Sequence, residues 1–431
     1  MRSRPVALLA ALPLVAAACW QVSAAETNGR LRLVTTETCL AKLHTGNIAG
    51  HPRFVASPDN RHEAHPIAPF GKPMVVALDG QAYGPGCQGI YDSTLTFSPD
   101  SRRLAFVAGA PQKGAQRSVV LDGVEGKQYD DVAMPLTFSP DSKRFACLAR
   151  KGKVWLAVVD GVEMKEYEQA AGPIAFDGEG KRIAYSAKAK GKWFIVADGQ
   201  EGDGYDLAVS PVLSSDGTHL AFAAKSGARC LVVVDGARQK EYDDLSTFSL
   251  TFSPDGKHLC YVAKRGDSWF VVADGVEGTG YDAASYPKYS PDSTRLAYYG
   301  VRGGKVMVVA DGVEGKQYDQ AAWLTFSPDS RRLAYVAILG EKKSVVVDGA
   351  AGPEYETVMA PTFSPDSRRL AYLAGTKDKL AVVVDGAETK CYDGIFWNTR
   401  PVFDGPDRLH VLVRLGPDLD AYCVDVQATE E

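Results

Sequence analysis

Histidines are the first candidates for chemistry in this chain, because four of the seven lie within 22 residues. They are His44, His51, His62 and His65. Imidazole nitrogens bind zinc, and His62 and His65 lie three residues apart with Glu63 between them, so one interpretation is a metal site. The alternative is a set of histidines on surface loops, since HEAH is not the HExxH metalloprotease motif and Pro66 stops a helix. We favour the surface interpretation and expect no bound metal.

The eight cysteines show neither the paired CxxC spacing of a metal framework nor the CxxCH spacing of a haem site. Their scatter is typical of cysteines that pack in a core. The alternative for one of them is a disulfide that Cys39 forms with Cys87 or Cys423 in an oxidising compartment.

Motifs for nucleophilic and phosphate chemistry are absent from the sequence. It has no GxSxG, no phosphate loop with Gly-Lys-Ser/Thr, no dinucleotide fingerprint and no Asp-box spacing at residues 214–218. Carboxylates recur in two contexts, after Ser-Pro as in Asp100 and before Gly as in Asp122. Both are turn positions, so we interpret these carboxylates as turn-capping groups and expect no catalytic residue and no cofactor.

The same two contexts mark an internal repeat with a spacing of 37 to 43 residues, which is the range of propeller blades. An aromatic-Ser-Pro-Asp anchor begins at Phe97, Phe138, Phe252, Tyr289, Phe326 and Phe363, with worn copies at Phe176, Leu213 and Phe403. An apolar run ends in Asp-Gly at Asp79, Asp122, Asp160, Asp198, Asp235, Asp274, Asp311, Asp348 and Asp385. The two anchors are independent, so the repeat is a strong signal.

Turn chemistry divides each copy into four strands. FSPD ends one strand, and a run such as LAYVA opens the next. A basic loop and a β-branched run follow, and Asp-Gly then makes a hairpin to a strand that ends in Tyr-Asp. The strands are apolar on consecutive residues, so both faces must be buried, as in blades stacked around an axis. We predict an all-β fold: a single large β-propeller of nine or ten four-stranded blades, closed by strands from both termini.

The segment FSPDSRRLAYVA, followed by a VVVDG-like strand, resembles the TolB-type, WD-like β-propeller repeats, which also occur in the propeller domains of the dipeptidyl peptidase IV group. The resemblance covers about residues 74–426 and implies the fold. It does not imply peptidase activity, because no hydrolase domain follows. The Trp-Asp dipeptide of eukaryotic WD repeats is absent, so the partners of that subfamily are not implied.

Residues 1–24 have the pattern of a signal peptide: Arg2 and Arg4, an apolar stretch, and the small residues Val22-Ser23-Ala24. We therefore predict export to the periplasm or the extracellular space. A lipoprotein cleavage site before Cys19, with a lipid anchor there, is the alternative. Removal of the segment changes the formal charge from −5 to −7, which argues against nucleic-acid binding, and we expect no membrane span.

The predicted organisation is a signal peptide at 1–24, an irregular segment at 25–73 that joins the ring closure, propeller repeats at 74–426 and a tail at 427–431. Met74 to Asp79 and Ile90 to Asp92 are predicted as the third and fourth strands of the first repeat. Ten blades result if residues 31–34 and 54–56 also pair, and nine if they do not. Two smaller rings are an alternative.

Two sets of loops carry the candidate binding features. Loops after the second strands are basic, as at Lys151 and Lys264, and acids such as Glu163 are expected in the third-strand loops of the opposite face, so one face is predicted to be basic. Large side chains follow the fourth strands on the basic side. The predicted ligand-binding residues are Phe248, Tyr286, Trp323, Phe396, Trp397 and Arg400. The alternative is that these side chains plug the channel.

Two function classes follow. The first is a non-catalytic exported propeller that binds an envelope protein or an anionic polysaccharide or other envelope polymer. The second is a propeller enzyme, a lyase, glycosidase or metal-assisted lactonase, with its site in the central channel. Because the copies are so alike, we favour binding. The feature that separates the classes is a non-repeating titratable residue at a channel-facing position.

Overall fold

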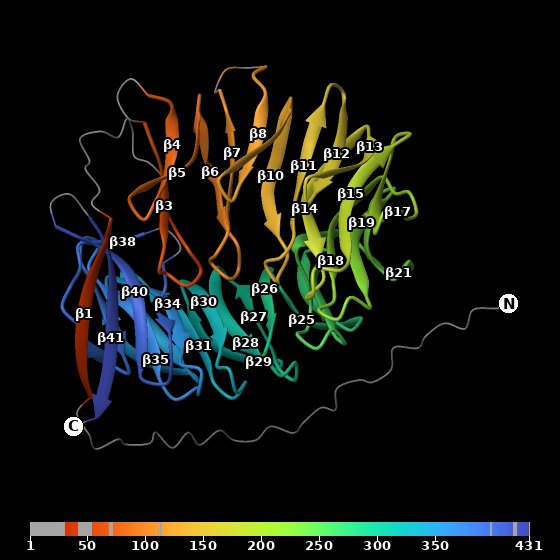
Figure 1. The fold of residues 1–431 in the computed structure, drawn as a ribbon. Coiled ribbons are helices and arrows are strands. Elements are labelled where there is room, and N and C mark those ends of the chain that lie inside the picture. Colours follow the sequence, from red (N-terminus) through yellow and green to blue (C-terminus); the bar gives the residue numbers. More distant parts are fainter. Residues whose placement is uncertain are drawn as a thin grey trace.

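The computed structural model describes residues 31–41, 54–68, 72–110, 112, 114–396, 399–416 and 420–430. These residues form strands and turns, and they contain no helix that is long and apolar enough to cross a membrane. The strands make ten antiparallel sheets, which succeed one another around a ring (Figure 1). Nine sheets have four strands and one has five, so the predicted propeller is confirmed, with ten blades.

The first five blades follow the chain. Blade one is β2 (Val55–Ala56), β3 (Glu63–Ile67), β4 (Met74–Leu78) and β5 (Gln81–Cys87). Blade two is β6 (Ile90–Phe97), β7 (Leu104–Gly109), β8 (Arg117–Leu121) and β9 (Val124–Tyr129). Blade three is β10 (Asp131–Phe138), β11 (Phe145–Lys151), β12 (Val154–Val159) and β13 (Val162–Tyr167). Blade four is β14 (Gln169–Phe176), β15 (Ile183–Ala189), β16 (Lys192–Ala197) and β17 (Gln200–Glu201). Blade five is β18 (Leu207–Leu213), β19 (Leu220–Ser226), β20 (Arg229–Val234) and β21 (Ala237–Tyr242).

The next four blades repeat the pattern. Blade six is β22 (Asp244–Phe252), β23 (Leu259–Arg265), β24 (Ser268–Ala273) and β25 (Val276–Tyr281). Blade seven is β26 (Ala283–Tyr289), β27 (Leu296–Arg302), β28 (Lys305–Ala310) and β29 (Val313–Tyr318). Blade eight is β30 (Gln320–Phe326), β31 (Leu333–Leu339), β32 (Lys342–Val347) and β33 (Ala350–Tyr355). Blade nine is β34 (Thr357–Phe363), β35 (Leu370–Gly375), β36 (Leu380–Val384) and β37 (Ala387–Glu388).

Blade ten joins the two ends of the chain, as predicted. Its inner strands are β38 (Gly394–Ile395) and β39 (Val402–Phe403), followed by β40 (Arg408–Leu415), β41 (Asp420–Glu430) and β1 (Leu31–Ala41). β1 pairs with β41 from Leu31 opposite Glu430 to Ala41 opposite Ala421, and the two strands lie side by side in Figure 1. Ring closure therefore depends on contacts between the two extremes of the described chain.

Strand pairing extends past the boundaries that the repeats indicated. β41 continues to Glu430, through the residues predicted as a tail, and β1, β2 and β3 belong to blades although they lie in the segment predicted as irregular. The prediction that Ile90 to Asp92 form the fourth strand of the first repeat is wrong. β5 is that strand, and Ile90 begins the inner strand of blade two.

The hydrophobic core lies between the blades. LAYVA-type and VVVDG-type strands are buried along consecutive residues, as in β31, because a neighbouring blade covers each face. The tyrosine that ends an outer strand meets an aromatic ring of the next blade edge-on, as Tyr242 does with Tyr261 at 6.2 Å between ring centroids. Such pairs add about 0.5–1.5 kcal/mol to the burial of the rings.

A recurrent arginine ties six of the described blades to the blade that follows, and we call it the arginine clasp. In Arg103, Nε donates to Asp122 of its own blade at 2.8 Å, and the guanidinium also donates to the Ser142 and Lys143 carbonyls of the next blade. The guanidinium lies 5.3 Å from the centroid of the Phe138 ring. The clasp residues are Arg103, Arg144, Arg182, Arg295, Arg332 and Arg369. The Arg of SPDSRR is thus an interface residue.

Histidine replaces the clasp arginine in three blades. His62, His219 and His258 place Nδ1 at 2.6–2.7 Å from Asp79, Asp235 and Asp274, respectively. These three histidines therefore lie in turns at the blade interfaces.

All seven cysteines of the described residues are free thiols. In the β1–β41 ladder Cys39 lies opposite Tyr422, next to the Thr38–Cys423 pair. Cys39 is exposed and Cys423 is buried, so their side chains lie on opposite faces of the sheet. The suggested Cys39–Cys423 disulfide is therefore wrong, and Cys87, in blade one, is also a free buried thiol. Cys19 and the predicted signal peptide lie outside the described residues.

An Arg103→Ala substitution should lower the free energy of unfolding by about 2 kcal/mol, because it removes charge-assisted hydrogen bonds that cross a blade interface. Denaturant titration of the mature protein measures this change. Lys127→Ala is the matched control: its ion pair with Glu163 is mostly exposed, so the loss should stay below about 1 kcal/mol. Equal losses in both variants would show that the clasp does not join the blades.

Acid should destabilise the ring through its Ser-Pro-Asp turns. The Ser290 hydroxyl is the main group that lowers the pKa of Asp292 to about 2, and Ser214 does the same for Asp216. An unfolded aspartate has a pKa of about 3.9, so this stabilisation is complete above that pH and is lost as pH falls through about 2. The thermal midpoint should fall between pH 4 and pH 2, and less steeply in Asp292→Asn. The same slope in both proteins would contradict this account.

Candidate functional site

The inner strands of blades two to nine contain a bulge, and blade ten has a break between β38 and β39 at the same place. These interruptions create a set of equivalent positions beside the channel. Strand pairing shifts register in blades two to nine, as between Ser285 and Lys288 and between Ala322 and Thr325. A bulge leaves a residue unpaired and re-aims its side chain. We call the following set the bulge positions: Ser93, Met134, Gly172, Ser210, Phe248, Tyr286, Trp323, Ala360 and Arg400.

Three consecutive blades carry aromatic residues at the bulge positions, and all three are exposed. The exposed fractions are 93% for Phe248, 75% for Tyr286 and 51% for Trp323. Large exposed aromatics that are grouped together mark interaction sites in soluble proteins. The structure thus brings three of the sequence-predicted residues into one array, which we call the aromatic arc.

Two residues of the arc have a strained backbone. Tyr286 has φ 52° and Trp323 has φ 59°, a left-handed conformation that is costly for bulky side chains. Blade four has Gly172 at the equivalent position, with φ 79°. Ser210 and Ala360 also have positive φ at these positions, 54° and 55°, so the left-handed conformation is a property of the bulge. What distinguishes Tyr286 and Trp323 is that the bulge exposes a large ring.

Side chains of blade seven hold the Trp323 bulge in place. Because the ladder is interrupted there, Leu324 takes other partners: its N–H donates to the Tyr299 hydroxyl at 2.9 Å, and its carbonyl accepts from Lys288 Nζ at 3.3 Å. The Tyr286 ring packs edge-on against Tyr299 at 6.0 Å. The arc is therefore a fixed platform.

The remaining residues predicted from the sequence differ in their exposure. Arg400 is exposed at the bulge position of blade ten, where its carbonyl accepts a hydrogen bond from Asn60 of blade one. Phe396 is only 1% exposed and packs against Phe54 and Arg414 at the junction of blades one and ten, so its side chain is not available to a ligand. Trp397 lies outside the described residues.

The predicted basic loops are neutralised in part. The acids expected on the opposite face, such as Glu163, lie on the outer strands and reach the basic loops, as in the Lys151–Glu163 pair at 3.0 Å. The Asp of Tyr-Asp pairs likewise, for example Asp319 with Lys305 at 2.6 Å. Asp319 also accepts from the Gly340 N–H of the next blade at 2.7 Å. These carboxylates reduce the charge of the loops, although cations such as Lys264 have no ion pair within the described chain. The pairing was not apparent from the sequence because the partners lie 12 to 14 residues away.

The interpretation of His62 and His65 as surface-loop histidines is wrong for His65. This residue lies in β3, is 3% exposed and is 2.8 Å from the buried carboxylate of Glu63. His62 bonds instead to Asp79, so His62 and His65 do not share a site. In this degenerate copy of the repeat, EAHPI stands where other copies have LAYVA. The apolar run that identifies the second strand elsewhere is missing, so the sequence pattern did not predict this strand.

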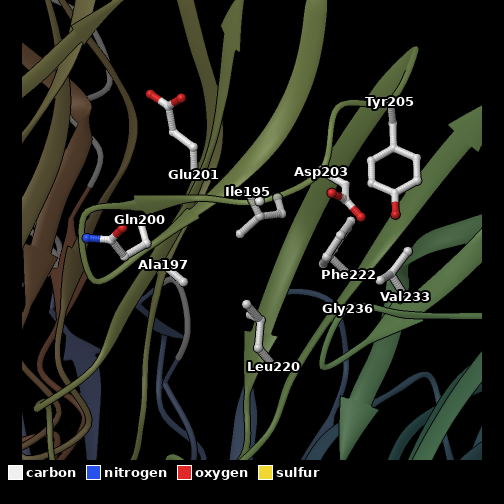
Figure 2. A pocket seen from close by; sticks show the side chains of 11 residues that line it. Ile195, Ala197, Gln200, Glu201, Asp203, Tyr205, Leu220, Phe222, Val233 and Gly236 are labelled. Carbon is white, nitrogen blue, oxygen red and sulfur yellow. The ribbon is translucent and has the colours of Figure 1, made fainter. Parts of the chain in front are cut away.

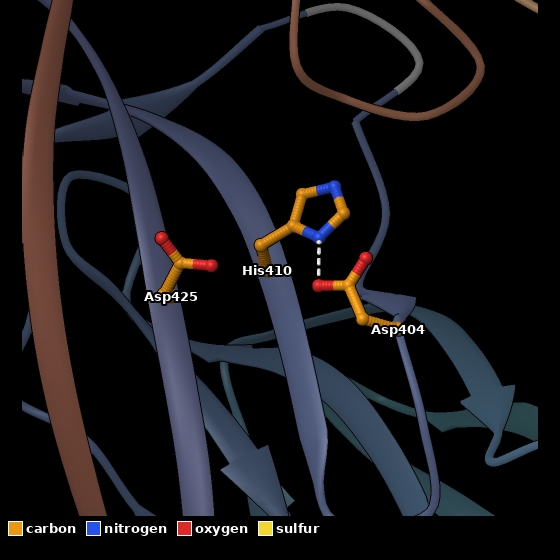
Figure 3. A group of neighbouring side chains, drawn as sticks. All are labelled: Asp404, His410 and Asp425. Carbon is orange, nitrogen blue, oxygen red and sulfur yellow. Dashed lines mark hydrogen bonds and ion pairs between the residues drawn. The ribbon is translucent and has the colours of Figure 1, made fainter.

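One histidine–carboxylate group, Asp404, His410 and Asp425, has the composition of a metal site (Figure 3). Its polar atoms already have partners at the junction of blades one and ten. His410 contacts Asp404 at 2.8 Å and the Asp59 carbonyl, and Arg61 donates to Asp404 at 2.9 Å. Burial favours the neutral form of Asp404, but the bonds from His410 and Arg61 outweigh it and lower its pKa. We interpret the group as a contact that closes the ring.

The clearest hollows on the described part of the chain lie at the outer rim. One, of about 220 Å³, lies between blades four and five and is lined by Ile195, Tyr205, Phe222 and Leu220, among others (Figure 2). A second lies between blades two and three at the same place in the repeat, near Tyr129 and Cys147. Because the hollow recurs, it reflects how neighbouring blades diverge at the rim and does not indicate a dedicated site.

Comparison with known proteins finds only distant likenesses. No family model and no curated protein matches the chain. Among solved structures, TolB from Acinetobacter baumannii is 14% identical, with 62% of this chain and 79% of that chain covered and a TM-score of 0.31. The dihydro-heme d1 dehydrogenase NirN is 13% identical, with 83% and 77% covered and a TM-score of 0.38. This chain is thus distantly similar to TolB and other propeller proteins, some of them enzymes, and these likenesses carry no argument about its activity.

A Tyr286→Gly variant should unfold with nearly the wild-type free energy, within about 1 kcal/mol, because relief of the positive φ offsets the greater freedom of glycine in the unfolded chain. Tyr242→Ala, at a fully buried ring, should cost about 3–5 kcal/mol and serves as the contrast. Denaturant titration of both variants measures the difference. A large loss in Tyr286→Gly would mean that the ring serves the fold.

Proposed function

We propose that this chain is a non-catalytic propeller that binds a protein partner at the aromatic arc. The observation that carries the proposal is the exposure of Phe248, Tyr286 and Trp323 at equivalent positions of three consecutive blades. Exposed Trp and Tyr rings on a rigid platform are the residues that dominate the energy of protein interfaces.

The other candidates receive less support. An anionic polymer would bind along the basic loops, where some cations are paired with carboxylates, as at Lys192–Asp206 and Arg302–Glu314, and others, such as Lys264 and Lys342, have no ion pair within the described residues. As far as the structure describes them, these loops carry no grouped aromatic rings of the kind that the arc presents, so the arc is the better-supported site. A hydrolytic or lyase site would need a carboxylate or a histidine as acid or base at the channel wall, and no described bulge position holds either. Lys288, on an inner strand, donates to the Leu324 carbonyl. The pattern of residues 1–24 supports export to the periplasm or the extracellular space as part of the proposal.

The test is a crosslinked capture from the cell envelope with tagged mature protein, at low and at high salt. We expect one protein to be recovered at both salts, because apolar contacts are not screened. A Phe248→Ser/Trp323→Ala variant should weaken recovery by at least thirty-fold, which corresponds to about 2 kcal/mol. Val313→Ser, at an exposed apolar residue of an outer strand, is the matched control. Full recovery with the double variant would exclude the arc as the binding site.

A further inference from the structure

The seam where the ring closes, between blades ten and one, differs from the seams that carry the arginine clasp. The blade-ten residue at the clasp position is Arg408, and its ion pair is with Asp425 of its own blade at 3.3 Å. The contact with blade one comes instead from His410 on β40, which bonds to the Asp59 carbonyl. Strand pairing puts alanine or cysteine at the His410 position in the other blades, as in Ala371. His410 is therefore a substitution specific to the closing seam.

Both ring nitrogens of His410 have partners that accept hydrogen bonds. Nδ1 lies 2.8 Å from the Asp404 carboxylate, as Figure 3 shows, and Nε2 contacts the Asp59 carbonyl. Arg61 donates to the same carboxylate at 2.9 Å, which favours its ionised form, and lies farther from Nδ1, at 3.3 Å. A neutral imidazole has one N–H, so the two contacts together need a second proton on the ring. The closed seam thus holds His410 as an imidazolium that is 1% exposed.

The other four histidines of the described residues do not need this extra proton. His62, His65, His219 and His258 each bond a carboxylate through Nδ1, and the one N–H of a neutral ring is enough for that contact. In each case the carboxylate belongs to the same blade as the histidine. Within the part of the chain that the structure describes, His410 alone bonds through both nitrogens and joins two blades.

The described groups around His410 keep their charge near neutral pH, whereas an imidazole titrates there. Side chains of β40 and β41 alternate, so His410, Cys423 and Asp425 face blade one while Val411 and Val424 pack against blade nine. Carboxylates and guanidinium groups stay charged at neutral pH, and burial raises the pKa of the Cys423 thiol to about 11. The groups that surround His410 are Asp59, Arg61, Asp404, Arg408, Cys423 and Asp425, and Glu63, His65 and Arg414 line the same seam near Phe54.

We propose that the seam between blades ten and one is a proton-dependent latch, which is closed while His410 carries both ring protons and opens when one of them is lost. A free imidazole loses this proton at about pH 6.5. The two bonds favour the protonated ring, so their stabilisation is complete below that pH and is lost as the pH rises above it. The arginine clasps keep their charge over the same range, so opening is confined to the closing seam. This inference does not rest on the proposed function.

The test uses Cys423 as a reporter, because its thiol is 5% exposed on the face of β41 that turns toward blade one. Cys147 is the reference: it is buried between blades two and three, at a seam that the Arg103 clasp closes. Modification of both thiols of the mature protein by N-ethylmaleimide is followed by peptide mass spectrometry at pH 6.5 and pH 8.5. The ratio of the two rates cancels the general effect of pH on thiol reactivity. We expect the ratio of Cys423 to Cys147 to rise at least tenfold, and an unchanged ratio would overturn the latch.

Three variants assign the response to His410. His410→Ala should fold, since alanine holds this position in most blades, and its Cys423 should react fast at both pH values. A rise as large as that of the wild type in His410→Ala would overturn the proposal. Asp404→Asn keeps the shape but removes the negative charge beside the imidazolium, so the rise should occur at a pH lower by about one unit. This variant decides the question if His410→Ala does not fold, and an unshifted rise would contradict the latch. His62→Arg, which restores the clasp residue in blade one, is the matched control and should respond as the wild type does.

Discussion

A sheet that is apolar on both faces must be covered on both faces, and the rest of this structure depends on that constraint. LAYVA-type and VVVDG-type strands cannot face water, so each blade needs a neighbour on either side, and only a closed ring gives one to every blade. The arginine clasp sets the spacing of neighbours, because one guanidinium bonds an aspartate of its own blade and carbonyls of the next. Histidine can replace it where a single bond to the aspartate suffices, as in His258.

Local turn chemistry made most of the fold predictable. FSPD and Asp-Gly are turn signals that act within a few residues, so the blades of the middle of the chain could be placed from sequence. The closing blade could not be placed fully, because the β1–β41 ladder joins segments about 400 residues apart and no local pattern records their register. The burial of Glu63 and His65 was missed for a related reason, since EAHPI lacks the apolar run that identifies the second strand elsewhere.

The candidate site was predictable in part. Phe248, Tyr286, Trp323 and Arg400 could be found because they break the uniformity of the repeat, and the structure places them all at bulge positions. Phe396 also departs from the repeat pattern, yet it is buried, because its ring packs beside Phe54 at the junction with blade one. Lys288, which bonds the carbonyl beside Trp323, was overlooked although the sequence contains a signal. Each blade has an equivalent residue just before the aromatic-Ser-Pro-Asp turn, and Lys288 is the one charged residue among threonines, valines and an alanine. Whether a side chain of an inner strand faces the channel depends on how the bulge shifts the alternation of that strand. Sequence patterns do not show this shift.

Blade ten contains strands from both ends of the described chain, and this also determines the order in which the ring can fold. Synthesis makes β1 before the other described strands and β41 after them, so β1 has no partner in its ladder until β41 has been made. During that interval one strand and the open faces of the first and the latest blade are exposed, and unpaired strands of this kind associate with other chains. The final step is the meeting of the most distant segments, which is slow because the chain entropy of a loop of several hundred residues is lost at once. In a propeller of this kind the middle blades can form before the ring closes. The ring resists opening only after β41 has paired with β1.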